Sequence, residues 1–479
     1  MGAGGKLEYK TTPKGDRIMD FSHAGYMGGG VTIPTVPVKR EVAPTGGDDT
    51  AAIQAAIAAV SAMPRVEGFR GTVLLQPDVF HCSDSLKIGA AGVVLRGAGM
   101  GERGTAIRMT GSPHPCIVIG ALHDGNLRAA RNVRPIQITD AYVPSGSSQV
   151  AVQSVQGFAA GDTVLIRHPI TSQWIALMGM DKLVRDGKPQ VWLKEGGSMD
   201  TERIIREIQG NRITFDAPLS DVLDVEFTGE AGATVVKADS SGRVSHSGLE
   251  ALAIVSVPPV GDLRVQHNDG IALQGCEDCW VRDVATRDTV TCVSIVSATR
   301  ITIESVKTDH TRPLEKGAGY PADFLVRGSR VLIHRSSCTG DGSFYYASLG
   351  PCDTSTVVLN CDFHGRGALQ PHMRWNTGLL LDGCRVDGGR IEFLNRGTSG
   401  SGHGWAIGWA VVWNCTAHSY LIQQPPAARN WAIGCRGPID RKCPTEGFFS
   451  HATPVVPTSL YLAQLRERLG EAALKNIGY

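Results

Sequence analysis

The sequence lacks any apolar stretch of the ~18–20 residues that a membrane-spanning helix needs, which argues against a transmembrane segment. Its first residues, Met1–Lys6, also lack the apolar centre of a secretion signal. We therefore expect either a cytosolic protein or a mature protein whose signal has been removed. The two absences alone do not distinguish between these cases.

An excess of charge of either sign is missing too. Lys and Arg together number 47 and Asp and Glu 46, which leaves a formal net charge of +1. A chain without a broad basic surface is a poor candidate for nucleic-acid binding, although this balance still allows a local basic groove. Hydrophobic residues make up 42% and charged residues 19% of the 479 residues, so we expect a globular protein. The length allows one large core or about two to three domains.

The 12 cysteines do not form a metal-binding pattern. Cys276 and Cys279 make a single C-x-x-C pair, without a second pair or a downstream His pair at zinc-finger spacing. Four further cysteines each follow a strand-like run at nearly the same offset, and we interpret them as small buried side chains of successive repeats. They are Cys361, Cys384, Cys415 and Cys435. Disulfides are neither required nor excluded, and the metal content stays unknown.

From about Gly248 onward the hydrophobic pattern repeats. Central positions of strand-like runs recur 20 to 32 residues apart, at Val281, Ile303, Ile333, Leu359, Leu381, Trp413 and Ile433. A base period near 20–22 with loop insertions is typical of a parallel β-helix, in which each coil buries its apolar face against the next. A leucine-rich horseshoe would need regular Leu and Asn positions that are absent. We predict an all-β, single-stranded right-handed parallel β-helix (solenoid) of roughly ten coils.

The N-terminal part supports this fold class through a resemblance. Residues 20–26 read D-F-S-x-A-G-Y, residues 47–57 read G-D-D-T-x-A-I-Q-x-A-I, and residues 93–99 read V-x-L-R-G-x-G. This order resembles the opening of the pectate-lyase-like right-handed β-helix proteins. The resemblance implies that a helix near Thr50–Val60, with Ile53 and Ile57 on its apolar face, caps the N-terminal end of the stack. It implies no single reaction, because that superfamily contains lyases, hydrolases and phage tailspikes.

We divide the chain into three segments. Residues 1–45 form an N-terminal extended segment, 46–450 the β-helix domain and 451–479 a C-terminal helical tail. Residues about 140–235 interrupt the repeat and read as an inserted β unit, in which Arg167, His168 and Trp174 are predicted to lean toward the main groove. In the tail, Leu462, Leu465 and Leu469 share one face of an amphipathic helix that ends at Gly470. Its S-L-Y-x-x-Q-L-x-x-R-L-G pattern also resembles the tail of many bacterial β-helix polysaccharide enzymes.

Residues Ala368 to Cys415 hold the densest set of chemically useful side chains. Three polar clusters within this stretch combine titratable groups, planar aromatics and glycines, which suits a sugar-binding cleft. The clusters supply His372, Arg374, Trp375, Asn395, Arg396, His403 and Trp405. Insertions on one face of a solenoid usually build its binding surface. We therefore add three residues of the long 303–333 interval, His310, Arg312 and Lys316, and the adjacent tyrosines Tyr345 and Tyr346.

The clustered residues match the chemistry of β-elimination on a polysaccharide that contains uronic acids. Such a reaction needs a base for the proton α to the carboxylate, cationic donors for the enolate-like intermediate and an acid for the leaving oxygen. His372, His403 or Tyr346 could serve as base or acid, and Arg374 and Arg396 could bind the carboxylate as planar forks. The pattern P-H-x-R-W-x-T-G-L-L-x-D, N-R-G-x-x-G-S-G-H-G-W, V-x-W-N-C is also similar to one in exported bacterial β-helix proteins associated with polysaccharide degradation. We predict a polysaccharide lyase, with Trp375, Trp405, Trp174, Arg167 and Tyr345 among the residues that contact the sugar.

Two alternatives stay open. The first is a glycoside hydrolase on the same scaffold, with two carboxylates about 6.5–9.5 Å apart for inversion or about 5–5.5 Å for retention. The acidic candidates are Asp309, Glu315, Asp323, Asp341, Asp353, Asp362, Asp382 and Glu392. None of them lies in a tight acidic motif. The second is a non-catalytic carbohydrate-binding protein like a tailspike, which the short C-terminal helix disfavours because tailspikes are usually intertwined trimers.

The same interpretation sets the expected partners. We expect a polysaccharide ligand, no nucleic acid, a monomer and a secreted or periplasmic location. Ca²⁺ could neutralise a uronate carboxylate, but no cofactor is certain because no Asp cluster aligns in successive coils. Structural roles also remain open, since Arg374 could pair with Asp382 or Asp387, and we favour a core role for Trp413.

Overall fold

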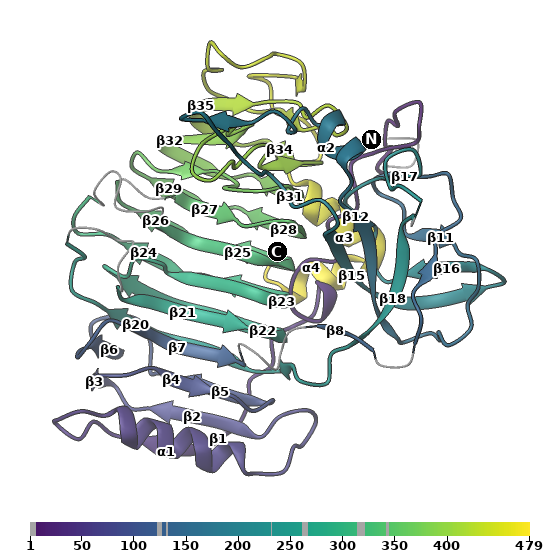
Figure 1. The fold of residues 1–479 in the computed structure, drawn as a ribbon. Coiled ribbons are helices and arrows are strands. Elements are labelled where there is room, and N and C mark those ends of the chain that lie inside the picture. The colour runs from purple at the N-terminus through teal and green to yellow at the C-terminus, as the bar shows by residue number, and fades with distance from the viewer. Residues whose placement is uncertain are drawn as a thin grey trace.

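The computed structural model describes residues 6–121, 127–130, 133–230, 232–260, 267–313, 321–341 and 344–479. The chain is mostly β, and most of its strands lie in one large sheet system with parallel pairing. Figure 1 shows these strands stacked above one another from the N-terminal helix at the bottom to the last strands at the top. We call residues 38–120, 244–255 and 269–449 of this system, where described, the coil stack.

Three parallel ladders form the coil stack, and long strands turn a corner to join two of them. The first ladder contains β1 (Val38–Val42), β2 (Gly71–Leu75), β5 (Val93–Arg96), β20 (Gly248–Val255), β22 (Cys276–Arg287), β23 (Val293–Glu304), β25 (Ala322–His334), β28 (Cys352–Leu359), β31 (Asn376–Asp382), β34 (Val411–Trp413), β36 (Trp431–Ile433) and β37 (Phe448–Phe449). The second contains β3 (Asp78–Cys82), β6 (Thr105–Met109), parts of β20 and β22, β24 (Lys307–Asp309), β26 (Ser337–Thr339), β29 (Asp362–His364), β32 (Arg385–Phe393) and β35 (Thr416–Ile422).

The third ladder contains β4 (Leu86–Ile88), β7 (Pro115–Gly120), β21 (Asp269–Gln274), parts of β23 and β25, β27 (Phe344–Ser348), β30 (Ala368–Leu369) and parts of β32 and β35. Two short strands, β19 (Val244–Ser245) and β33 (Ile407–Gly408), pair with β22 and β31. Each strand thus pairs with the strand one coil further on, and the buried core lies between the ladders. This arrangement is consistent with the predicted parallel β-helix.

The predicted register is correct in the first coils and wrong by one residue later. Val281 pairs with Ile303 and Ile303 with Ile333, as the sequence indicated. Beyond these, the inward positions are Val358, Leu381, Val412 and Ala432, so that Leu359, Trp413 and Ile433 were each placed one position too late. Since successive strand residues point to opposite faces, these three side chains point out of the stack.

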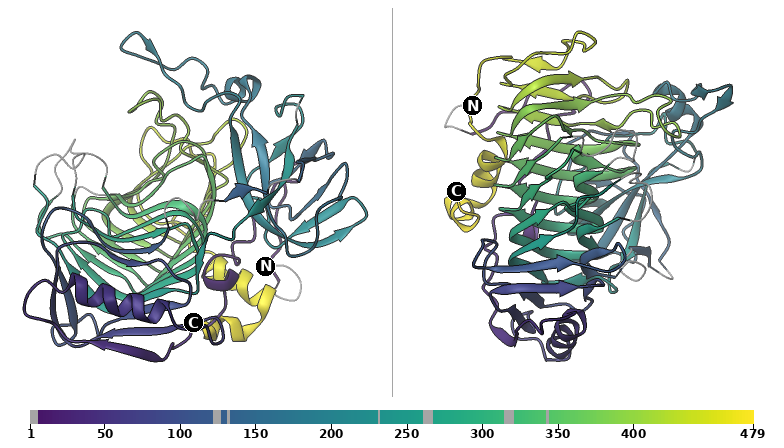
Figure 2. Two further views of the ribbon diagram at one scale, coloured as in Figure 1. Left: turned by 60° about the horizontal axis from the view of Figure 1, so that its bottom comes forward. Right: turned by 90° about the vertical axis from the view of Figure 1, so that its left-hand side faces the viewer.

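The N-terminal helix α1 (Thr50–Ser61) covers the end of the stack beside β1 and β2 (Figure 2), where the resemblance placed it. Ile53, Ile57 and Val60 are buried in the core of the stack. The Asp49 side chain does not cap the helix, because it accepts hydrogen bonds from the backbone nitrogens of Thr45 (2.6 Å) and His81 (2.9 Å). Upstream, a short 3-10 turn η2 (Tyr26–Gly28) lies against β22 and β23.

A separate antiparallel unit interrupts the stack between β7 and β19. We call it the insertion, and its elements are β8 (Arg128–Ala129), β9 (Ile136–Gln137), β10 (Tyr142–Val143), β11 (Gln149–Ala151), β12 (Thr163–Pro169), α2 (Ser172–Leu177), β13 (Val184–Arg185), β14 (Lys188–Pro189), β15 (Ser198–Gln209), β16 (Arg212–Phe215), β17 (Leu223–Asp224) and β18 (Thr234–Asp239). It has its own apolar core and lies beside the stack in both views of Figure 2. Its short helix α2 carries Trp174 and was not anticipated.

Buried ion pairs fasten the insertion to the stack. The Arg203 guanidinium of β15 lies 2.6 Å from the Asp353 carboxylate of β28, and both side chains are almost completely buried. The Ser220 hydroxyl donates to the same Asp353 carboxylate at 2.7 Å. Arg243 binds Glu202 at 2.7 Å, again with little exposure of either side chain. The insertion is therefore held in a fixed position relative to the stack.

The C-terminal helices α3 (Leu460–Leu469) and α4 (Glu471–Asn476) pack on the outer side of the first ladder rather than over an open end. The Ser459 hydroxyl caps α3 by accepting from the Leu462 nitrogen at 3.1 Å. The predicted apolar face was wrong at Leu469, which is 46% exposed, because the buried face runs through Leu460, Tyr461 and Leu465. Trp413 is buried beneath this helical cover, as favoured, but outside the coil rather than inside it.

All 12 cysteines are free thiols. The predicted row of four cysteines is present, since the thiol of each of these four residues donates to a carbonyl of the preceding coil. The pairs are Cys361 to Ile333 (3.6 Å), Cys384 to Val358 (3.2 Å), Cys415 to Leu381 (3.4 Å) and Cys435 to Val412 (3.5 Å). Among the helices of the described ranges, none has the length and apolar character needed to cross a membrane.

Candidate active site

His372 and His403 come together from two successive coils. His372 follows β30, and its backbone nitrogen donates to the Ser348 carbonyl at 3.0 Å. His403 lies in the loop between β32 and β33. The two imidazole rings are 4.8 Å apart between centroids at an interplanar angle of 60°, and each residue is only 6% exposed.

A chain of polar side chains continues from the histidines along the outside of the third ladder. The Arg396 guanidinium donates to the Gln370 side-chain oxygen, and the Gln370 amide nitrogen donates to the Glu392 carboxylate. Glu392 lies between the fully buried Ile391 and Phe393, and strand alternation therefore turns it outward. Arg390 lies 3.3 Å from its carboxylate.

Burial and neighbouring cations keep both histidines neutral near pH 7. Burial, then the Arg396 charge and His403, lowers the pKa of His372 to about 3. Burial, then the charges of Arg396 and Arg374, lowers the pKa of His403 to about 4. Each ring can thus accept or donate a hydrogen bond as neutral imidazole, but each is a weak base while the site is empty of an anion.

Arg374 connects this cluster to a neighbouring cavity. Its Nε donates to the Gly402 carbonyl at 3.2 Å and its second guanidinium nitrogen to the Ser401 carbonyl at 2.9 Å. Its remaining nitrogen makes no hydrogen bond with the described part of the chain. The pairing with Asp382 or Asp387 considered from sequence is not formed, since Asp382 binds Ser459 and Tyr461 instead.

The cavity beside Arg374 has a volume of about 610 Å³ and lies between the insertion and the loops of the stack. Its lining residues are Ile170, Pro189, Gln190, Val191, Trp192, Leu193, Lys194, Gly197, Ser198, Gly350, Pro351, Arg374 and Ser401. Lys194 and Arg374 are the charged members of this set, and no carboxylate belongs to it. The cavity combines an apolar wall with two cations and is suited to an anionic ligand.

The insertion also holds the His403 loop in place. Gly402 and Gly404 have φ values of 83° and 55°, in the left-handed region that favours glycine. A Cβ atom on Gly404 would lie 2.3 Å from the Trp192 ring, and one on Gly402 would lie 3.0 Å from Gln190 Cβ. The Trp192 ring nitrogen donates to the Trp405 carbonyl at 3.2 Å. The His403 loop therefore packs closely against residues 190–192.

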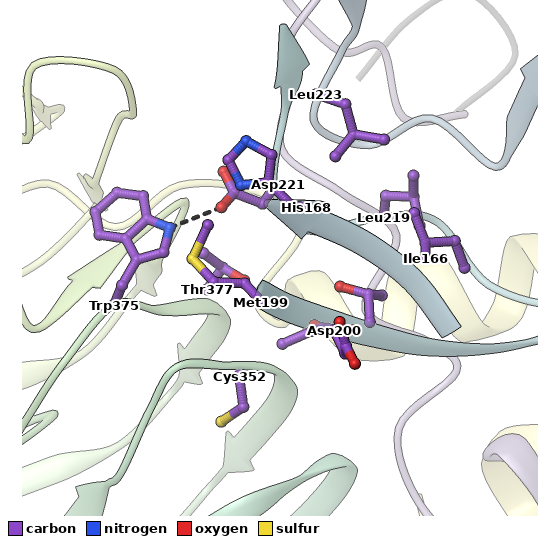
Figure 3. A pocket seen from close by; sticks show the side chains of 12 residues that line it. Ile166, His168, Met199, Asp200, Leu219, Asp221, Leu223, Cys352, Trp375 and Thr377 are labelled. Carbon is purple, nitrogen blue, oxygen red and sulfur yellow. Dashed lines mark hydrogen bonds between the residues drawn. The ribbon is translucent and has the colours of Figure 1, made fainter. Parts of the chain in front are cut away.

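The tryptophans predicted to stack on sugar mainly join the insertion to the stack. Trp375 is 2% and Trp174 3% exposed, and their rings lie 5.7 Å apart in an edge-to-face contact. The Trp375 ring nitrogen donates to Asp221 at 2.7 Å, and both residues line a cavity of about 20 Å³ at this junction (Figure 3). That volume is about one water site. Trp405 is partly buried, and its ring nitrogen donates to the Met178 carbonyl at 3.0 Å. Neither Trp375 nor Trp174 lines the Arg374 cavity.

The roles predicted for the two tyrosines are also wrong, because both side chains are buried. Tyr345 and Tyr346 are both 0% exposed in the core of the coil stack. Burial raises the pKa of each hydroxyl above its usual value, which disfavours the phenolate a base would require. The pairing of β27 with β30 shifts register between Phe344 and Tyr346, and this irregularity allows two adjacent rings to enter the core.

The remaining candidates are dispersed. His310 is buried, and its Nε2 lies 2.6 Å from the Asp323 carboxylate. Arg167 forms a bidentate ion pair with Asp200 on the insertion, with N–O distances of 3.0 and 2.9 Å. Arg312 is exposed, and Lys316 lies outside the described residues. Asn395 lies at the site, where its backbone nitrogen donates to the Gln423 side chain at 2.7 Å.

Sequence reasoning missed Lys194, Trp192 and Gln370, and it considered Glu392 only as one of many carboxylates. Gln370 follows the buried Leu369, and Glu392 lies between the buried Ile391 and Phe393. Strand alternation could therefore have marked both side chains as outward-facing. Lys194 and Trp192 lie far from residues 368–405 in sequence and carry no local pattern. As for a metal, the described ranges contain no group of three or more His, Cys, Asp or Glu residues that could hold one.

Comparisons with known proteins give structural similarity only. No protein-family model and no curated protein matches the chain. The tailspike protein gp49 from Pseudomonas phage LKA1 is similar over 82% of this chain and 65% of its own, with 14% identity and a TM-score of 0.45. The tailspike protein of E. coli bacteriophage HK620, solved in complex with a pentasaccharide, is similar over 94% of this chain and 63% of its own, with 9% identity and a TM-score of 0.44. PfbA, a surface adhesin of Streptococcus pneumoniae, is similar over 85% and 80%, with 10% identity and a TM-score of 0.37.

The chain thus spans less than two thirds of the length of these two tailspikes. At identities of 9–14%, the similarities assign neither a family nor an activity to it.

Proposed function

We propose that the protein recognises an acidic polysaccharide, with a carboxylate of the polymer bound in the cavity beside Arg374. The observation that carries this proposal is the charge of the lining, which contains Arg374 and Lys194 and no carboxylate. The Arg374 nitrogen that does not bind the His403 loop is available to donate a charge-assisted hydrogen bond to a carboxylate. Arg396 extends the positive charge toward the histidine pair.

The scaffold suits such a ligand. We propose that the coil stack is a single-stranded right-handed parallel β-helix of the pectate-lyase-like kind, with the insertion at about 140–235 as an excursion from it. Successive coils lie about 4.8 Å apart, so an extended polymer can meet side chains from several coils. We further propose that the protein acts outside the cell, where extended acidic polysaccharides occur.

Cleavage by β-elimination is a second candidate, favoured by the 4.8 Å contact of His372 with His403 beside Arg396. An arginine would hold the uronate carboxylate and stabilise the enolate-like intermediate. One imidazole would accept the α-proton, the bond between the β-carbon and the glycosidic oxygen would break, and the proton would pass to the leaving oxygen from that imidazolium, directly or through the second imidazole. A bound carboxylate would offset the arginine charges that lower both histidine pKa values, and the bases would then be stronger with substrate than without it.

A panel of uronate polymers, each paired with its carboxyl-reduced neutral form, tests the proposal. We expect binding to at least one acidic polymer and loss of binding to its reduced partner. Equal binding to both forms, or binding to neither form across the panel, would overturn it. Ultraviolet absorbance of an unsaturated product would add lyase activity, whereas new reducing ends without that absorbance would identify a hydrolase.

A further inference from the structure

His168 is a buried imidazole that the proposed function does not use. It lies on β12, is 6% exposed, and its Nδ1 atom is buried without a hydrogen-bond partner in the described part of the chain. Burial lowers the pKa of His168 to about 4, so the ring is neutral near pH 7. A buried polar group without a partner is uncommon in folded proteins and calls for a water or ligand atom.

Besides the 20 Å³ cavity at the junction, His168 lines a larger cavity to which Trp174 and Leu177 of α2 also contribute, and we call it the second cavity. Its volume is about 450 Å³, within the range of roughly 300–1,000 Å³ that small-ligand sites occupy. The N-terminal segment, the insertion and residues 426–429 of the stack enclose it. Trp174 of this cavity stacks on Trp192 of the Arg374 cavity with ring centroids 5.0 Å apart, which places the two cavities back to back.

The chemistry of the second cavity differs from that of the first. Four aromatic residues contribute to its wall, namely Tyr142, Trp174, Phe227 and Trp409. Its charged residues are Asp16, Asp224, Glu226, Lys14 and Arg429, so acidic and basic groups nearly balance. The Lys14 ammonium lies 2.9 Å from the Asp224 carboxylate and 4.7 Å from the centre of the Tyr142 ring. These contacts already neutralise part of the charge.

We propose that this second cavity binds an uncharged, hydroxyl-rich sugar unit and that the His168 ring is its innermost hydrogen-bond partner. Carboxylates accept hydrogen bonds from sugar hydroxyls, and aromatic side chains pack against the apolar face of a pyranose. A neutral imidazole both donates and accepts, which suits a hydroxyl group. An anionic sugar would meet three carboxylates here and belongs in the Arg374 cavity instead.

Saturation-transfer NMR on the full chain tests this site with cellobiose, maltose, lactose and N,N′-diacetylchitobiose as separate probes. We expect at least one probe to bind the wild type. Ala428→Trp fills the cavity and should abolish that binding. His168→Phe preserves the ring shape but removes both nitrogens, and it should weaken binding by roughly tenfold or more, the effect of losing one good hydrogen bond.

The controls separate this site from the first and from a merely structural histidine. Arg374→Gln should leave disaccharide binding unchanged, and thermal melting should show each variant to be folded. A packing role alone predicts that His168→Phe melts no lower than the wild type and binds the probe equally well, and that result would overturn the proposal. Failure of all four probes to bind would overturn it too. Glu226→Gln, at an exposed carboxylate of the rim, replaces His168→Phe if that variant does not fold, and it should weaken binding by a measurable factor.

Discussion

The imidazole rings of His372 and His403 lie 4.8 Å apart, although the strands β31 and β32 separate the two residues in sequence. Stacked coils explain this closeness, because each coil returns the chain to the same side of the stack one level higher. Arg396 lowers the pKa of both rings, and Arg374 lowers that of His403. The two neutral histidines and these two arginines together form the centre of the proposed site.

We expect neither histidine to titrate between about pH 5 and pH 8, the range in which ordinary imidazoles do. Their pKa values are lowered to about 3 for His372 and about 4 for His403, mainly by burial. Their contribution to the free energy of unfolding is therefore complete above about pH 6.5 and is lost as the pH falls toward those values. NMR titration of the imidazole resonances measures this directly. A midpoint near 6.5 for either ring would show that the site is more hydrated than the structure indicates.

Gly404→Ala should displace the His403 loop and weaken binding of an acidic polymer. The new Cβ atom would lie 2.3 Å from the Trp192 ring, and the residue has a φ of 55°. Gly397→Ala is the matched control, since Gly397 has a φ of 50° and no atom within 4 Å of a built Cβ. Both variants carry the cost of a left-handed alanine, about 1–2 kcal/mol, but only Gly404→Ala adds the clash. Affinity is measured by titration with the polymer. Equal affinity in the two variants would show that the position of the His403 loop does not affect binding.

Arg203→Met should destabilise the protein by about 3–5 kcal/mol, because it leaves the Asp353 charge buried without its partner. The pair is 2.6 Å long and almost fully buried. Arg167→Met is the control, since Arg167 and Asp200 on the same insertion are 36% and 28% exposed. An exposed pair of this kind contributes about 1 kcal/mol or less. Urea unfolding of both variants provides the comparison, and similar losses in the two would refute the role given to Arg203 in docking the insertion.

Asp382→Asn should alter how stability depends on pH. Burial raises the pKa of Asp382 to about 7, while its carboxylate accepts from the Ser459 hydroxyl at 2.7 Å and the Tyr461 nitrogen at 2.8 Å. An acid whose folded pKa is raised contributes stability that is present below its unfolded pKa, about 4, and is lost as the pH rises to about 7. The asparagine variant lacks this loss. We expect the melting temperatures of wild type and variant to diverge over that interval, and parallel curves would contradict the buried position of Asp382 beneath α3.

The coil repeat could be read from sequence because inward positions of successive strands are apolar and evenly spaced. The register was lost at Leu359 because β28 is apolar on both faces. Val358 points into the stack, whereas Val357 and Leu359 point out beneath the C-terminal helices. Where both faces are buried the alternation disappears, and a pattern of period two cannot distinguish them. The covering helix was itself predicted, but not the side of the stack on which it lies.

The site was predictable only where its residues are close in sequence or one coil apart. His372, Arg374, Arg396 and His403 satisfy that condition and lie near one another. Lys194 and Trp192 reach the same place through the insertion, and no local pattern reveals a contact of that kind. The tryptophans were assigned to the ligand because an aromatic beside an arginine suits sugar binding, but Trp174 and Trp375 instead fill the junction between insertion and stack.

The most direct test of the proposed function is the coupling between the Arg374 charge and the carboxylate of the ligand. Affinities of wild type and Arg374→Gln are measured for a uronate oligosaccharide and for its carboxyl-reduced form. We expect the wild type to prefer the acidic form by about tenfold or more, as for a charge-assisted hydrogen bond, and Arg374→Gln to lose most of that preference. If the variant keeps the full preference of the wild type, the ligand carboxylate does not bind at Arg374 and the proposed site is wrong.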